Sequence, residues 1–94
     1  MPASSEQAIT QVITLGGVLH ARPAGQLAVA AARFDADVSL TVGDRTASAK
    51  SVLAVMGLGA TSGQRVTAAA TGPDAEQAVT AVVAILADAT AVGG

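Results

Sequence analysis

With 94 residues, a net charge of −2 and no cysteine, this chain lacks the material for several kinds of site. It is too short for two independent hydrophobic cores, so we expect one domain over residues 1–94, ordered from about 8 to 89. Five Lys and Arg residues and one aromatic side chain argue against a nucleic-acid partner, because that needs a basic face and stacking aromatics. The lack of Cys and the single His argue against thiol chemistry and a metal site.

The apolar content is mainly Ala, Val and Leu, which predicts a thin core without a roomy ligand pocket. We therefore expect neither an enzyme with an enclosed active site nor a bound cofactor. The first six residues contain no basic or apolar stretch typical of a signal peptide. The longest apolar run, 81–87, is far shorter than a membrane span. These features favour a cytoplasmic protein without membrane insertion, and we expect a monomer.

The first half of the chain predicts a strand, a helix and then a hairpin of two strands. Residues 8–15 are rich in β-branched side chains and predict a strand. Residues 21–34 predict a helix with Leu27, Ala31 and Phe34 on one face. Residues 37–42 alternate, which points Val38, Leu40 and Val42 inward. The turn Gly43-Asp44 then leads into a returning strand over 45–49.

The second half predicts a short helix, a strand and a long helix. Ser51 is placed to cap a helix over 52–56 that Gly57 stops. A strand over 64–71 would bury Val66, Ala68 and Ala70. Asp74 and Gln77 form a variant of the capping box for a helix over 75–89. The buried face of that helix is predicted to contain Ala78, Val79, Val82, Ile85, Leu86 and Ala89.

The order β-α-β-β-α-β-α predicts an α+β fold, an open-faced β-sandwich. In it, a four-stranded antiparallel sheet has helices on one face only.

His20 lies where the chain enters the first helix, and it is the only imidazole. Pro23 suits a first helical turn, since its missing N–H costs no hydrogen bond there. The unpaired N–H groups of a helix start attract anions such as phosphate. A neutral imidazole there is a nucleophile, and Arg22 could stabilise the phosphate it accepts. The alternative is a histidine that only caps the helix. No second group is placed to activate water, so a carrier suits the pattern better than a hydrolase.

The short helix near residue 52 has more apolar side chains than it can bury. Val55 and Leu58 have the better claim to the core. Val52, Leu53 and Met56 are then left as an exposed apolar patch, which is typical of a partner-binding surface. The alternative is that all five belong to the core.

Two motifs resemble the HPr family, the histidine-containing phosphocarriers of the bacterial phosphoenolpyruvate:sugar phosphotransferase system. They are Leu-His-Ala-Arg-Pro-Ala over 19–24 and Ala-Ser-Ala-Lys-Ser over 47–51, the second followed by Met-Gly-Leu-Gly over 56–59. The resemblance spans about residues 8–89. One departure is the stretch Gly-Gly-Val over 16–18, where the family usually has a small polar residue and then Gly before the Leu-His or Ile-His pair.

The resemblance implies the open-faced sandwich and a role for particular residues. His20 would accept phosphate on Nδ1 from phosphorylated enzyme I and pass it to the IIA domains of sugar permeases, while Arg22 steadies the phosphoryl group. Ser51 matches a regulatory serine that an ATP-dependent HPr serine kinase phosphorylates in some bacteria. The patch of Val52, Leu53 and Met56 would lie near the active loop.

Two alternatives to sugar uptake stay open at this point. One is a phosphocarrier in a nitrogen-related or dihydroxyacetone-kinase branch, which would share the active loop. The other is a regulatory binding module of the same fold, against which the intact pair His20 and Arg22 argues.

Overall fold

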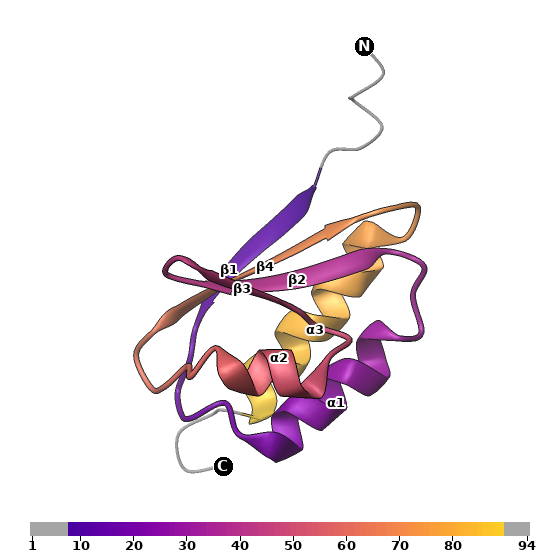
Figure 1. Ribbon diagram of the computed structural model, residues 1–94. Helices are drawn as coiled ribbons and strands as arrows, with labels where there is room; N and C mark the ends of the chain where they lie inside the picture. Colours follow the sequence, from indigo (N-terminus) through magenta and orange to yellow (C-terminus); the bar gives the residue numbers. More distant parts are fainter. Residues whose placement is uncertain (1–7, 90–94) are drawn as a thin grey trace.

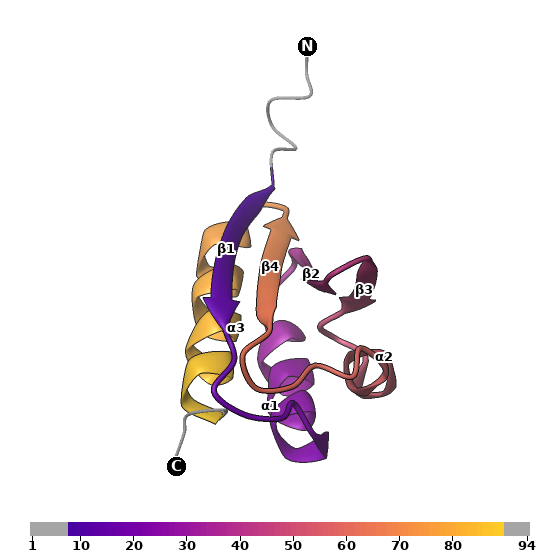
Figure 2. The ribbon, with the colours of Figure 1, turned by 90° about the vertical axis from the view of Figure 1, so that its left-hand side faces the viewer.

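The computed structural model describes residues 8–89 as a sheet with a helical layer against one face (Figure 1). The elements in chain order are β1 (Ile9–Thr14), α1 (Ala21–Ala31), β2 (Asp37–Val42), β3 (Arg45–Ser48), α2 (Val52–Gly57), β4 (Arg65–Thr71) and α3 (Ala75–Ala89). The strands lie in the order β1-β4-β2-β3, and each neighbouring pair is antiparallel. Figure 2 shows the helices on one side of this sheet. The predicted α+β open-faced sandwich is confirmed.

The core lies between the sheet and the helices because the central strands alternate. Val38, Leu40 and Val42 of β2 are buried, as predicted, and so are the alternate residues Val66, Ala68 and Ala70 of β4. Side chains from all three helices close the core, among them Leu27, Val55, Val79, Val82 and Leu86.

The hairpin between β2 and β3 turns at the predicted residues. Gly43 has a φ of +61°, whereas no residue other than glycine has a positive φ within the described range. A positive φ at the first turn residue alone fits the turn type that begins with glycine.

The first helix is shorter than predicted, ending at Ala31 instead of residue 34. The amide N–H groups of Arg33 and Phe34 donate to the carbonyls three residues back, so the chain leaves α1 through tightened turns. Phe34 is half-buried and packs against the core from outside the helix. In α3, Ala78, Val79, Val82 and Leu86 are buried as predicted, but Ile85 is only half-buried. The side chain of Ala89 lies outside the described residues.

The prediction that Gly57 stops the second helix was wrong. Gly57 is the last residue of α2, and Leu58 caps it. Gly59 follows with a φ of +65°, and its N–H donates to the Met56 carbonyl at 3.1 Å. The residue that needs glycine is therefore Gly59, at the left-handed position after the cap.

The capping box at the start of α3 was also wrong. The Asp74 carboxylate accepts hydrogen bonds from the backbone N–H groups of Asp35, at 3.0 Å, and Ala36, at 2.8 Å. It thus ties the loop before β2 to the turn before α3. Nearby Gly72 has a φ of +130°, and a Cβ there would lie 2.9 Å from the Ala36 Cα. Only glycine permits this approach.

Candidate functional site

His20 is the N-cap residue of α1 and is exposed to solvent. Its backbone is extended, with φ −99° and ψ −167°, and its side chain does not cap the helix. The first helical hydrogen bond runs from the Ala24 N–H to the His20 carbonyl at 3.1 Å. Within residues 8–89, the N–H groups of Ala21 and Arg22 have no acceptor. The imidazole therefore stands free beside two unpaired backbone donors.

The loop that carries His20 is fixed to the core immediately before it. Leu19 is only 3 % exposed, and its N–H donates to the Ala60 carbonyl at 3.1 Å. Pro23 and Ala24, just after His20, are buried as well. These anchors fix the backbone on both sides and leave the imidazole outside. This arrangement holds the imidazole in place without covering it.

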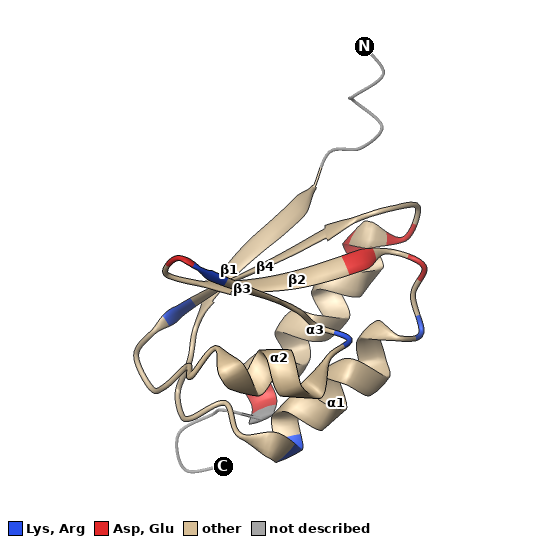
Figure 3. Cartoon of the chain, viewed as in Figure 1, with Lys and Arg blue, Asp and Glu red and all other residues tan. Residues whose placement is uncertain are grey.

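Arg22 lies in the first turn of α1 and is exposed. It lines a shallow hollow of about 650 Å³ between α1 and α3, together with Gln26, Val29, Arg33 and Ile85 among others. Among the described residues, neither Arg22 nor His20 has a side-chain hydrogen bond or ion pair. Figure 3 shows a basic residue in the first turn of α1, and Arg22 is the only Lys or Arg of that helix. Its guanidinium is thus available to an anion on His20.

Ser51 caps α2, as the sequence predicts. Its hydroxyl oxygen accepts a hydrogen bond from the Ala54 N–H at 3.2 Å. The preceding residue, Lys50, reaches the carbonyl of Phe34 beyond the end of α1, at 3.4 Å. The other end of α2 leads into Ala60, which holds Leu19. The His20 loop is therefore linked to the segment after α2. Ser51 lies at the opposite end of α2, whose six residues span about 9 Å.

The apolar patch is exposed in two of its three predicted residues. Leu53 is 82 % exposed and Met56 is 40 % exposed. Val52 is half-buried and packs against the core, so it contributes less than predicted. Val55 and Leu58 are buried, as expected. Helices α1 and α2 lie side by side in Figures 1 and 2, which brings this surface next to the helix that begins after His20.

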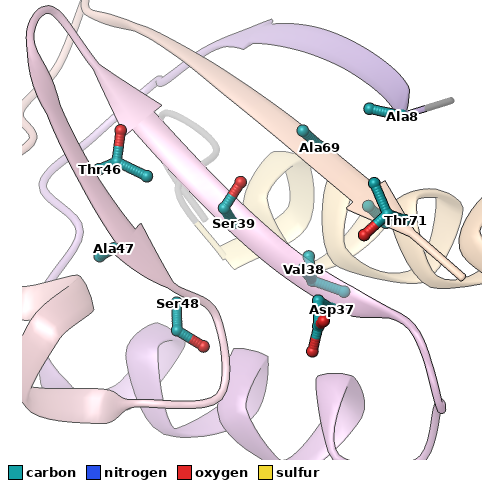
Figure 4. Close-up of a pocket in the computed structure, with 10 residues that line it drawn as sticks. Ala8, Asp37, Val38, Ser39, Thr46, Ala47, Ser48, Ala69 and Thr71 are labelled. Atoms are coloured by element: carbon teal, nitrogen blue, oxygen red, sulfur yellow. The ribbon is translucent and has the colours of Figure 1, made fainter. Parts of the chain in front are cut away.

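The open face of the sheet has a hollow of about 460 Å³, shown in Figure 4. It is lined by Ala8, Asp37, Val38, Ser39, Thr46, Ala47, Ser48, Ala69, Ala70 and Thr71. Asp37 is its only charged residue, and none of the predicted site residues lines it. Within residues 8–89 no three His, Asp or Glu side chains gather as a metal site requires. No described helix is long and apolar enough to cross a membrane.

Two hydrogen bonds near the site could not be predicted from the sequence. The hydrogen bonds from Leu19 to Ala60 and from Lys50 to Phe34 join segments that are far apart in the chain, and no local motif predicts them.

A free imidazole beside unpaired backbone N–H groups is placed where an anion would be favoured, and comparison with known proteins decides the family. The family model "PTS HPr component phosphorylation site" matches residues 7–88. The chain belongs to the HPr family. It is therefore a phosphocarrier of the phosphotransferase system, which relays phosphate without catalysing a reaction of its own.

Individual members of the HPr family resemble the chain along most of its length. Phosphocarrier protein HPr of Vibrio cholerae is 43% identical over 74 residues, 79% of this chain and 87% of that protein. Phosphocarrier protein NPr of Shewanella violacea is 38% identical over 81 residues, 86% of this chain and 87% of that protein. The crystal structure of HPr from Bacillus anthracis matches with a TM-score of 0.78 at 31% identity, covering 84% of this chain and 96% of that one.

Proposed function

We propose that His20 accepts a phosphoryl group from phosphorylated enzyme I and donates it to IIA domains of sugar permeases. The observation that carries this proposal is the exposed imidazole at the N-cap of α1, the single histidine of the chain. In each transfer the phosphorus–nitrogen bond of the donor breaks as a phosphorus–nitrogen bond to the acceptor forms, so no water and no cofactor is consumed.

Arg22 and the free amides at the start of α1 support phosphorylated His20 more than the unmodified side chain. The phosphate would bring negative charge to a helix start, where the dipole and unpaired N–H groups favour it. Charge-assisted hydrogen bonds from Arg22 would add to this. The acceptor would thus be stabilised when loaded, and among the described residues no side chain is hydrogen-bonded to His20 that could activate water.

We propose that partners dock on the His20 loop and the patch of Val52, Leu53 and Met56. Leu53 and Met56 supply exposed apolar area on α2, which packs beside α1, and interfaces concentrate their binding energy in such anchors. Ser51 is proposed as a second, regulatory phosphorylation site. Its phosphate would face the start of α2 and place negative charge beside the patch.

A phosphorylation assay tests the acceptor and the branch together. The protein is mixed with phosphoenolpyruvate and enzyme I of a sugar system, and in parallel with the nitrogen-related counterpart of enzyme I. We expect an acid-labile, base-stable phosphate on His20, formed faster by the sugar enzyme. Faster phosphorylation by the nitrogen-related enzyme would assign the chain to that branch, as the resemblance to NPr allows. No acid-labile phosphate with either enzyme would contradict the proposal.

A further inference from the structure

The two edges of the sheet are protected to different degrees. Strand β3, at one edge, has only four residues and begins with Arg45. The Arg45 guanidinium Nη1 donates to the Gly57 carbonyl at 3.5 Å, and α2 packs beside this strand. A short, charged edge discourages pairing with another chain.

Strand β1, at the other edge, has none of these protections. It is six residues long, and its register with β4 runs without a bulge from Ile9–Ala70 to Thr14–Arg65. Residues 8–14 include no charged residue and no proline. Ile9 is 39 % exposed and Val12 is 57 % exposed. An edge strand directs half of its backbone hydrogen-bonding groups away from its neighbour, so β1 presents a template for another strand.

We infer that the strand that pairs with this edge is β1 of a second copy, antiparallel about a two-fold axis. Residues that oppose each other across the two strands must lie on the same face of the sheet. The two-fold axis therefore runs between the two copies of one residue, so that this residue opposes its own counterpart. Ile9, Gln11 and Ile13 oppose buried residues of β4, which puts them on the helix side. Thr10 and Val12 oppose Thr67 and Ala69, which lie on the open side.

An axis at Gln11 gives favourable pairs from Ile9 to Ile13. Ile9 then opposes Ile13 of the second copy, and Thr10 opposes Val12. Gln11 opposes its own counterpart, where two amides can hydrogen-bond to each other. β-branched pairs are among the better cross-strand pairs, and no like charges meet. With these pairs, the edge of β1 is complementary to the same edge of a second copy.

The pairing is weak and leaves the proposed partner surface open. One strand pair buries much less than a stable interface, so we expect a dissociation constant on the order of 0.1 to 1 mM. The chain is then monomeric at micromolar concentration, as the sequence predicts. α2 packs on β3 at the far edge, so each copy keeps Leu53 and Met56 accessible.

Sedimentation equilibrium from about 10 μM to about 2 mM tests this pairing. We expect wild type to dimerise, whereas Gln11→Lys and Gln11→Glu each stay monomeric because like charges meet at the axis. An equimolar mixture of the two variants should dimerise again. Thr46→Lys and Thr46→Glu are the matched controls, exposed on the opposite edge strand, and should behave as wild type. A monomeric wild type, unaltered association of the Gln11 variants, or a mixture that stays monomeric would each overturn the inference.

A second variant covers the case in which a charged residue disturbs the strand. The chain has no cysteine, so Gln11→Cys introduces a single thiol. We expect oxidation at high concentration to give a disulfide-linked dimer, and much less of it with Thr46→Cys. Equal yields from the two variants would contradict an axis at Gln11.

Discussion

Single side chains at the start of α1 divide the chemistry between them. His20 offers a ring nitrogen that can bond to phosphorus, and Arg22 offers a permanent positive charge two residues later. Both are exposed and both lack a partner among the described residues, so neither is committed to holding the fold. Substitutions here should change transfer and leave stability intact.

Arg22→Ala should slow phosphoryl transfer to and from His20, because the guanidinium would also stabilise the charge of the phosphoryl group in the transition state that both directions share. One lost charge-assisted hydrogen bond corresponds to a rate loss of about tenfold to a hundredfold. Rapid-quench kinetics with enzyme I measures it. Arg33→Ala is the matched control, because Arg33 is another exposed arginine that lines the same hollow at the far end of α1. Equal rates for the two variants would show that the backbone amides suffice.

Ser51→Asp should keep the helix cap but slow phosphorylation of His20. Asp accepts from the Ala54 N–H as Ser does, whereas Ser51→Ala should lose about 1 kcal/mol of unfolding free energy. The added charge lies beside the apolar patch, so its effect on the rate should shrink in high salt. Thr80→Asp, which adds the same charge to an exposed position of α3, is the control. Identical transfer rates for Ser51→Asp and Thr80→Asp at low salt would leave Ser51 as a cap alone.

Among the elements, α2 separates a buried side from an exposed apolar side within six residues. Leu53→Glu should weaken binding to enzyme I and to IIA domains, with little change in unfolding free energy, because the side chain is 82 % exposed. Calorimetric titration and urea unfolding measure the two effects. Val12→Glu makes the same kind of change on β1 and should leave partner binding unaltered. A Leu53→Glu protein that unfolds would mean that Leu53 supports the core.

The clamp between the loop before β2 and the turn before α3 is predicted to act on stability alone. Asp74→Ala removes the acceptor of two backbone N–H groups and should cost about 2 kcal/mol of unfolding free energy. Gly72→Ala should also destabilise, because its φ is +130° and the new Cβ would meet Ala36. Urea unfolding measures both, with Glu76→Ala as the exposed acidic control. Unchanged stability of Asp74→Ala would show that the clamp is dispensable.

For the molecule as a whole, the spacing of apolar residues in the strands and helices predicts the fold, because each of these elements buries one face in the same core. β2 and β4 alternate cleanly, and α3 repeats its apolar residues every three or four positions. The helix ends and caps were less predictable. Asp74 reads locally as a helix cap but bonds a loop 38 residues earlier, and Gly59 takes the left-handed position expected of Gly57. Both outcomes depend on contacts that only the assembled fold creates.

The positions of the candidate site residues could be predicted from the sequence, but the packing and hydrogen bonds around them could not. The exposed His20 at a helix start, the Ser51 cap and the exposed Leu53 follow from local sequence, since each depends on one helix end or one helix face. The partial burial of Val52 could not be predicted from the local sequence. Which side of a six-residue helix packs inward is decided only by its contacts with α1 and β3. The same holds for the bond between Leu19 and Ala60 that fixes the loop.

We expect His20 to be the sole phosphate acceptor in the phosphoenolpyruvate-dependent chain. The most direct measurement incubates wild type and His20→Ala with labelled phosphoenolpyruvate and enzyme I, and compares the acid-labile label on each. Because His20 is exposed and makes no side-chain hydrogen bond within the described residues, the variant should unfold at the same urea concentration as wild type. We expect stoichiometric label on wild type and none on folded His20→Ala. Acid-labile label on the variant, or none on wild type, would contradict the assignment of His20 as the acceptor.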